Sequence, residues 1–313
     1  MSKKVRNSLI LLAMIAVPAA AFVAWASQAT ATRHAASVSP LGQASSREAL
    51  VSSLSTGQHV KFRAIKSANW SVPLSGLLNL NHPTAQSAAL KDKEEPIQVY
   101  AYHIEHPTHG NFLIDTGISQ QFVEDPAAQG IPRILRSQLG FDRLEILTST
   151  ESVISNMQRP LKGVFMTHLH LDHISGLPAV DKQVPVYVGR GESAERYFLF
   201  AATRGIVDTV LRGRPELREW SEPYVDIFGD GSVFAIHSPG HTAGSTAYLI
   251  NTASGPILIA GDACHTAWGW NNNVEPGKFS TNQPMSRISL NRLVELVKEF
   301  PQIAVRPGHQ ILN

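Results

Sequence analysis

The ten residues "THLHLDHISG", Thr167–Gly176, place three histidines and an aspartate within six consecutive positions. A chain of this length would contain the pattern H-x-H-x-D-H by chance in roughly one case in a thousand. The stretch follows a short apolar run, 163–167, of the kind that forms a strand buried in a sheet. Loops at the ends of strands often carry functional groups, because a rigid scaffold holds them in place. We therefore interpret the stretch as one part of a metal site.

The spacing within this stretch predicts ligands for two ions. His168 and His170 are two residues apart on an extended loop, so both side chains can point to the same side. Asp172 and His173 follow where a helix begins and face the other way, which suits a second ion. A zinc ion needs three or four ligands at about 2.0–2.3 Å, so more ligands are required downstream. Three candidates follow strands or apolar runs: His241 in "SPGHTAGS", Asp262 in "IAGDA" and His309 in "RPGHQ".

Together these candidates amount to five histidines and two aspartates. That set is large enough for two metal ions that share one carboxylate. Zn²⁺ is the expected ion, because its ligands in proteins are imidazole nitrogen, thiolate sulfur and carboxylate oxygen.

Apolar patterning predicts a strand-rich body with few helices. Helical spacing extends over 192–213 and over 286–300, where Ser286 or Ser289 is a candidate N-cap and Pro301 a stop. Two packed sheets covered by helices, within one domain over 57–313, account for this pattern. We expect strands over residues 59–65, 97–106, 110–117, 163–168, 184–189, 232–241, 245–251 and 255–263.

The first 26 residues have the pattern of an export signal. A basic start precedes an uncharged run, 9–26, which ends in small residues that fit the A-x-A cleavage pattern. We predict a cleaved signal peptide, with an uncleaved anchor as the alternative, because eighteen helical residues span about 27 Å of a ~30 Å bilayer core. Either way the protein is expected to be exported, periplasmic or secreted. We interpret the Ser- and Ala-rich residues 27–56 as a linker.

Composition argues against several classes of function. Hydrophobic residues make up 43% of the chain and charged residues 17%, as is usual for a globular protein. The formal net charge is +2, and it falls to about −1 without the three basic residues at positions 3, 4 and 6. A basic surface for nucleic acid is therefore not expected. A membrane is expected as a partner only through an uncleaved anchor, and the sequence makes no prediction of oligomeric state.

Five motifs resemble those of the metallo-β-lactamase superfamily, over residues 60–313. They are, in chain order, "NFLIDTG", "THLHLDH", "SPGHTAGS", "GDA" and "PGH". The resemblance implies an α+β fold, a four-layer αβ/βα sandwich with a dinuclear metal site at one edge of its two sheets. It also implies the ligands: His168, His170 and His241 for the first ion, Asp172, His173 and His309 for the second, and Asp262 as the bridge between them.

A dinuclear site of this kind implies a hydrolase. Two ions about 3.5–4 Å apart provide a hydroxide at neutral pH and polarise a substrate oxygen. We expect the metal-bound hydroxide to attack a carbonyl or phosphoryl centre, while Asp172 passes a proton to the leaving group. Asp115, in "NFLIDTG", is expected to orient the metal loop by hydrogen bonds rather than to bind an ion.

Within the superfamily, the motifs favour a small-molecule lactone substrate. True β-lactamases usually carry Ser or Cys in place of the bridging aspartate, so Asp262 argues against them. Glyoxalase II-like thioesterases keep the aspartate, but the short segment after His309 leaves no room for their basic C-terminal region. The stretch 101–117 and the intervals between the metal motifs are similar to those of N-acyl homoserine lactonases, the enzymes of quorum quenching.

One position departs from the lactonase pattern. Those enzymes commonly have a tyrosine three residues after the bridging aspartate, where it contacts the substrate carbonyl; here the position is His265. The histidine either donates the same hydrogen bond as a catalytic residue or indicates another substrate class. The competing class is the organophosphate and aryl ester hydrolases of the methyl parathion hydrolase type, which are also exported.

Several residues near the motifs have two interpretations. The aromatic ones either line a substrate pocket or pack structural elements. They are Tyr197, Phe198 and Phe200 in one segment, and Trp268 and Trp270 in another. Cys264, the sole cysteine, is expected to be a buried small residue rather than a reactive thiol.

Overall fold

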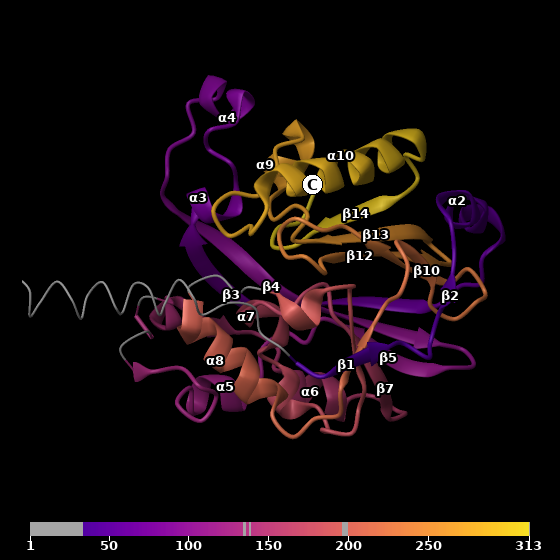
Figure 1. The fold of residues 1–313 in the computed structure, drawn as a ribbon, viewed down its shortest axis with the longest axis horizontal. Helices are drawn as coiled ribbons and strands as arrows, with labels where there is room; N and C mark the ends of the chain where they lie inside the picture. Colours follow the sequence, from indigo (N-terminus) through magenta and orange to yellow (C-terminus); the bar gives the residue numbers. More distant parts are fainter. Residues whose placement is uncertain (1–33, 134–135, 138, 196–199, 313) are drawn as a thin grey trace, which may run out of the picture.

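The computed structural model describes residues 34–133, 136–137, 139–195 and 200–312 of the chain (Figure 1). The predicted signal peptide or anchor lies outside these residues, so export stays a prediction. Within the described ranges, no helix is both long and apolar enough to cross a membrane.

Eight strands of the described chain form the first sheet, in the order β1-β9-β8-β7-β5-β4-β3-β6. A long antiparallel hairpin of β3 and β4 leads into β5, and from β5 across to β1 all neighbouring strands are parallel. Parallel strands end at the same edge, so the loops after β5 and β7 lie side by side. The strands are β1 (Ala36–Val38), β3 (Lys61–Pro73), β4 (Glu94–His106), β5 (Gly110–Ile114), β6 (Glu145–Ile146), β7 (Leu161–Phe165), β8 (Val186–Val188) and β9 (Leu217–Glu219).

The second sheet contains six of the described strands, in the order β14-β13-β12-β11-β10-β2. Neighbours are antiparallel except β13 and β14, which are parallel. The C-terminal ends of β11, β13 and β14 therefore meet at one edge of this sheet. The strands are β2 (Gln43–Ala44), β10 (Tyr224–Asp226), β11 (Val233–His237), β12 (Thr246–Thr252), β13 (Gly255–Gly261) and β14 (Ala304–Pro307).

The two sheets face each other and helices cover their outer faces, which gives the expected four layers (Figure 1). Along β12, Tyr248 and Ile250 point into the core between the sheets, whereas Ala247 and Leu249 point to the helices. Both faces of the strand are buried, and this explains its continuous apolar sequence. The α+β sandwich predicted from the motifs is confirmed.

The helices divide between the two outer faces. Those over the first sheet are α5 (Gln120–Glu124), α6 (Thr150–Ser155), α7 (Leu171–Ile174) and α8 (Phe200–Leu211), and those over the second are α2 (Arg47–Thr56), α9 (Ala267–Asn272) and α10 (Gln283–Glu299). The connection from β3 to β4 carries α3 (Leu74–Leu77) and α4 (Pro83–Ser87). Three short 3₁₀ helices complete the described elements: η2 (Phe141–Arg143), η3 (Leu177–Ala179) and η4 (Glu192–Ala194).

Helix α10 has the expected apolar stripe but a different N-cap. Its Leu290, Leu293 and Val294 are buried against the second sheet, as predicted. The helix begins earlier than predicted, because the Asn282 side chain accepts a hydrogen bond from the Met285 amide at 3.1 Å. The assignment of Ser286 or Ser289 as the cap is therefore wrong, and both serines lie buried inside the helix. The end of the helix before Pro301 is confirmed.

The described part of the predicted linker, residues 34–56, belongs to the fold instead. Strand β1 pairs with β9 in the first sheet and β2 pairs with β10 in the second, so this segment contacts both sheets. Helix α2 then buries Leu50 completely in the core under the second sheet. The composition was misleading because both strands are short, partly exposed edge strands with little apolar periodicity.

The replacement Leu50→Ala tests whether this segment contributes to stability. We expect a loss of about 2–5 kcal/mol in the free energy of unfolding, measured by urea denaturation, because a buried leucine leaves a cavity. Val38→Ala in the same segment is the control, since Val38 is 69% exposed and its loss should cost less than about 0.5 kcal/mol. Equal stability of the two variants would mean that the segment is a linker after all.

Candidate metal centre

The loop after β7 carries four of the predicted ligands. His168 lies in the loop itself, and His170 has extended backbone and occupies the N-cap position of the short helix α7. Asp172 and His173 lie inside that helix, so their side chains leave the backbone in another direction. The side chains of the two pairs therefore point in different directions, as predicted.

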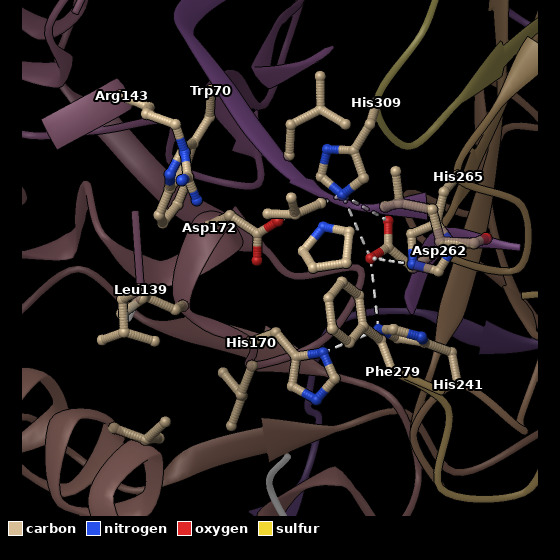
Figure 2. Close-up of a pocket in the computed structure, with 17 residues that line it drawn as sticks. Trp70, Leu139, Arg143, His170, Asp172, His241, Asp262, His265, Phe279 and His309 are labelled. Atoms are coloured by element: carbon tan, nitrogen blue, oxygen red, sulfur yellow. Dashed lines mark hydrogen bonds and ion pairs between the residues drawn. The ribbon is translucent and has the colours of Figure 1, made fainter. Parts of the chain in front are cut away.

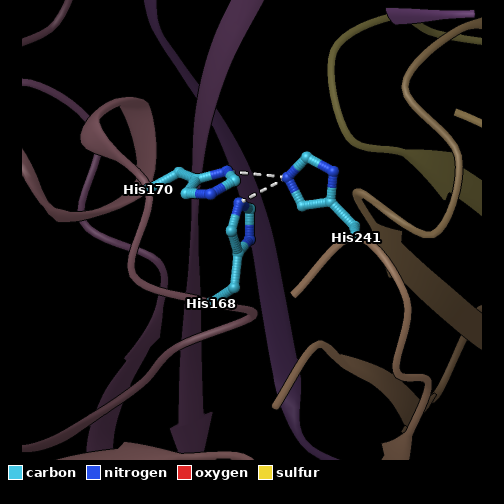
Figure 3. A group of neighbouring side chains, drawn as sticks. All are labelled: His168, His170 and His241. Atoms are coloured by element: carbon cyan, nitrogen blue, oxygen red, sulfur yellow. Dashed lines mark hydrogen bonds between the residues drawn. The ribbon is translucent and has the colours of Figure 1, made fainter. Parts of the chain in front are cut away.

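His168, His170 and His241 form the first group of converging side chains (Figure 3). His241 follows β11 of the second sheet, and its Nε2 lies 3.1 Å from His168 Nε2 and 2.8 Å from His170 Nδ1. Nitrogen ligands of a tetrahedral zinc ion lie about 3.3 Å apart, given Zn–N bonds of about 2.0–2.1 Å. The three rings are thus arranged much as they would be around one ion.

The protonation of these three rings also suits a metal ion. Burial lowers the pKa of His168 and of His241 well below the usual range, and it lowers that of His170 to about 4. Metal ions bind the neutral form of imidazole, so these rings need not lose a proton at neutral pH.

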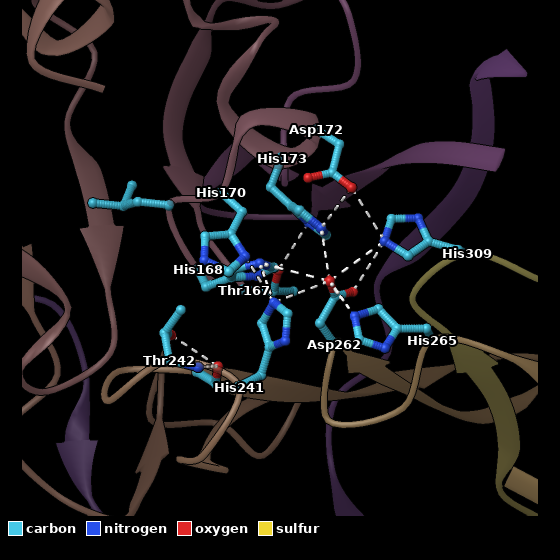
Figure 4. A network of polar contacts seen from close by, with 12 residues as sticks. Thr167, His168, His170, Asp172, His173, His241, Thr242, Asp262, His265 and His309 are labelled. Carbon is cyan, nitrogen blue, oxygen red and sulfur yellow. Dashed lines mark hydrogen bonds and ion pairs between the residues drawn. The ribbon is translucent and has the colours of Figure 1, made fainter. Parts of the chain in front are cut away.

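Asp172, His173, Asp262 and His309 form the second group (Figure 4). Asp262 directly follows β13, and His309 lies just past β14, the parallel neighbour of β13. His309 Nε2 lies 3.2 Å from an oxygen of Asp172 and 3.3 Å from an oxygen of Asp262. His173 Nε2 lies 3.5 Å from Asp262 and 3.7 Å from Asp172. All seven predicted ligands therefore come together at one edge of the two sheets.

Asp262 lies between the two groups. Its Oδ2 is 3.3 Å from His241 Nε2 and 3.6 Å from His168 Nε2 on one side, and 3.5 Å from His173 Nε2 on the other. Burial acts to raise the pKa of Asp262, but the surrounding imidazoles, led by His265 and His309, hold it well below its usual range. An ionised carboxylate in this position is placed to bridge two cations.

The donor atoms of the second group fit a divalent ion. Nδ1 of His173 lies 2.8 Å from an Asp115 oxygen, and Nδ1 of His309 lies 2.9 Å from the Gln98 carbonyl, so each Nδ1 donates and each Nε2 faces the centre. His173 Nε2 and Asp262 Oδ1 are buried without a hydrogen-bond partner. Such atoms are costly to bury unless something pairs with them, and imidazole nitrogen with carboxylate oxygen is a ligand set for zinc.

Asp115 supports the metal loop, as predicted. Its oxygens accept hydrogen bonds from the Thr167 amide at 2.7 Å and from the Thr167 hydroxyl at 2.8 Å, in addition to the bond with His173. Burial acts to lower the pKa of His173, but the carboxylates of Asp115, Asp262 and Asp172 raise it well above its usual value. Asp115 has a φ of 51°, which is uncommon outside glycine, so its backbone is held in a strained form to reach the loop.

His265 is almost fully buried beside the bridging carboxylate. The ring is 1% exposed, its Nδ1 donates to the Leu77 carbonyl at 2.8 Å, and its Nε2 lies 3.1 Å from Asp262 Oδ2. With His241 and Asp262 it forms a third group that has ligand spacing. The contact between His265 and the bridging carboxylate was not predicted from the sequence. The only signal for it there is the position of His265, three residues after Asp262.

A pocket of about 300 Å³ opens directly on the centre (Figure 2). His170, Asp172, His241, Asp262 and His309 line one end of it, together with His265. Figure 2 shows Trp70 and Arg143 on the side opposite His241 and His265. The remaining wall is largely apolar and was missed from the sequence, because its residues come from separate elements without a motif: Trp70, Leu77, Ile97, Leu139, Val207 and Phe279.

Trp268 and Trp270, two of the aromatic residues singled out in the sequence, are not part of this wall. Trp270 packs in the core under the second sheet, and Trp268 packs against Leu74 and Val274, so both stabilise the loop. Tyr197, Phe198 and the side chain of Phe200 lie outside the described part of the chain. Cys264 is buried, and burial raises the pKa of its thiol to about 12, which agrees with an unreactive residue.

Residues 95–304 match the family model of the metallo-β-lactamase superfamily. The chain belongs to this superfamily. It is a hydrolase of that superfamily and is homologous to lactonases.

Two relatives of low sequence identity are N-acyl homoserine lactonases. The chain is 26% identical to N-acyl homoserine lactonase AttM of Azorhizobium caulinodans over 234 residues, which are 71% of this chain and 82% of AttM. It is also 26% identical to an N-acyl homoserine lactonase of a Bacillus species over 250 residues, or 76% of this chain and 91% of that protein.

Solved structures share the same fold. The crystal structure of a quorum-quenching N-acyl homoserine lactone lactonase matches with a TM-score of 0.60 at 20% identity, over 81% of this chain and 93% of that one. The hydrolase AbOPH, of the β-lactamase superfamily, matches with a TM-score of 0.50 at 17% identity, over 81% of this chain and 90% of that one. At this identity the likeness concerns the fold alone.

The replacement Asp115→Ala tests whether the supporting carboxylate matters for metal binding. The seven candidate ligands remain, but His173 loses the bond that fixes its ring, so we expect about 10–100-fold weaker binding of one ion. Competition with a chromophoric chelator measures this. The matched control is Asp230→Ala, which removes a similar carboxylate–histidine pair, Asp230 with His106 at 2.9 Å, from another part of the fold. Unchanged metal affinity in Asp115→Ala would contradict the supporting role.

Proposed function

We propose that the protein opens the ring of a lactone that carries an apolar acyl arm, as in N-acyl homoserine lactones, and so acts in quorum quenching. The observation that carries the proposal is the pocket that joins an apolar wall to the metal centre. A substrate with a polar ring at the metal end and an apolar arm along the wall suits this shape. Lactonases that match most of the chain support the same substrate class.

The proposed cofactors are two Zn²⁺ ions. The first ion would be held by His168, His170 and His241, and the second by Asp172, His173 and His309. Asp262 would bind both ions. When bound, such ions lower the pKa of a water molecule and polarise a carbonyl oxygen.

The chain's own residues transfer a proton, contact the substrate carbonyl and bind the apolar arm. The Asp172 side chain is 20% exposed against 3% for Asp262, so it is the more accessible of the two carboxylates that line the pocket. We assign it the transfer of a proton to the ring oxygen that leaves when the lactone opens. His265 lies at the floor of the pocket beside Asp262, where it contacts the substrate carbonyl. The apolar wall binds the arm and keeps water away from it.

An aryl phosphotriester is the second candidate substrate. Trp70 and Phe279 line the pocket, and aromatic side chains there suit an aromatic leaving group. His265 in place of tyrosine is also compatible with attack at phosphorus.

A substrate panel on protein of measured metal content tests the proposal. The panel contains N-hexanoyl homoserine lactone, a glutathione thioester, an aryl phosphotriester and a cephalosporin. We expect the lactone to have a kcat/KM at least about tenfold above the others, since it places a polar ring at the metal end and an apolar arm along the wall. A higher kcat/KM for the phosphotriester or the thioester would replace the lactone as substrate.

The variant Phe279→Ala isolates the contribution of the apolar wall. Loss of one large apolar contact should lower kcat/KM for the acylated lactone about tenfold or more. γ-Butyrolactone, which has no arm, is the control substrate and should be hydrolysed by the variant nearly as well as by the wild type. An equal loss for both lactones would show that the wall does not bind the arm.

A further inference from the structure

Glu192, the first residue of η4, is a fully buried carboxylate beside the metal centre. Its Oε1 accepts a hydrogen bond from the Leu169 amide at 2.7 Å. Its Oε2 accepts one from the Thr242 hydroxyl at 2.6 Å and one from the Gly244 amide at 3.1 Å. Both oxygens are thus occupied by donors from two separate loops.

These donors lie next to the ligands of the first group. Leu169 is the residue between His168 and His170, and Thr242 directly follows His241. The first loop extends from the first sheet and the second loop from the second sheet. The single side chain of Glu192 therefore joins the two halves of the three-histidine group.

Close packing keeps these loops in place around the carboxylate. A Cβ added at Gly244 would lie 2.4 Å from Glu192 Cβ, and one added at Gly189 would lie 1.8 Å from the Gly244 carbonyl oxygen. Both positions therefore require glycine, and the second loop lies directly against the backbone that carries Glu192.

We propose that Glu192 is a positioning residue that sets the distance between His241 and the pair His168 and His170, and thereby the affinity of the first metal site. The inference rests on the proposed function only in that the three histidines bind an ion, and it is independent of the substrate. A carboxylate fits this position because both of the Glu192 side-chain oxygens accept hydrogen bonds. An amide at this position would turn an NH₂ group toward the Gly244 N–H, which is also a donor.

Titration of metal-free protein with Co²⁺ tests this role, with the visible absorption of the bound ion as a spectroscopic readout. We expect Glu192→Gln to weaken the first site about 10–100-fold and to change its absorption spectrum, with a smaller effect on the second site. The matched control is Asp226→Asn, which alters a carboxylate that accepts from the Gly229 and Gly231 amides at 2.9 and 2.8 Å, at the far end of β11. This control should keep both sites unchanged.

A second variant guards against misfolding of the first. Thr242→Val removes one of the three donors to Glu192 and leaves the carboxylate in place, and we expect the first site to weaken several-fold. If Glu192→Gln binds two Co²⁺ ions with wild-type affinity and spectrum, or if both sites weaken equally in both Glu192→Gln and Thr242→Val, the positioning role is refuted. Absence of Co²⁺ binding by the wild-type protein would instead refute the proposed metal centre itself.

Discussion

Six imidazole rings and two carboxylates meet inside this protein with donor atoms facing one another, and a bound cation would satisfy several of them at once. His241 Nε2 lies within 3.1 Å of a nitrogen of His168 and of a nitrogen of His170, and burial keeps all three rings neutral. Hydrogen bonds among the three rings cannot satisfy all of these nitrogens. Asp262 is almost fully buried, and its charge is compensated only by imidazoles around it. A buried charge needs compensation, and cations bound at this centre would supply more of it than the imidazoles do.

The fold provides the rigid frame that this cluster needs. The ligands follow the C-terminal ends of β7, β11, β13 and β14, which the two sheets bring to one common edge. Hydrogen bonds tie the sheets together at that edge: the Tyr248 hydroxyl donates to the Met166 carbonyl at 2.8 Å, and the Thr246 amide donates to the Thr167 carbonyl at 2.8 Å. Ligands from different sheets therefore keep fixed distances, which a metal site requires.

The sequence was sufficient to predict the fold and the candidate ligands. "THLHLDH" and the three downstream motifs combine histidine and aspartate in a way that is rare outside metal sites. The strands that precede these motifs are strongly apolar. Asp115 was also placed correctly beside the metal loop. Residues 34–56 were interpreted wrongly, because an edge strand of two or three residues has no period to detect.

Other features depend on tertiary contacts that leave no local pattern. The pocket wall unites Trp70 of β3, Val207 of α8 and Phe279 of a late loop, and Glu192 acts on loops from both sheets. The N-cap of α10 was missed because Asn282 precedes the apolar stripe by several residues. The roles of such residues can be assigned only from the folded structure.

Anomalous X-ray diffraction at the zinc absorption edge, on crystals of the zinc-loaded protein, tests the central claim most directly. We predict two peaks per chain, one among His168, His170 and His241, the other among Asp172, His173 and His309, with Asp262 between them. A single peak, or zinc bound elsewhere while these side chains contact only one another, would contradict the account.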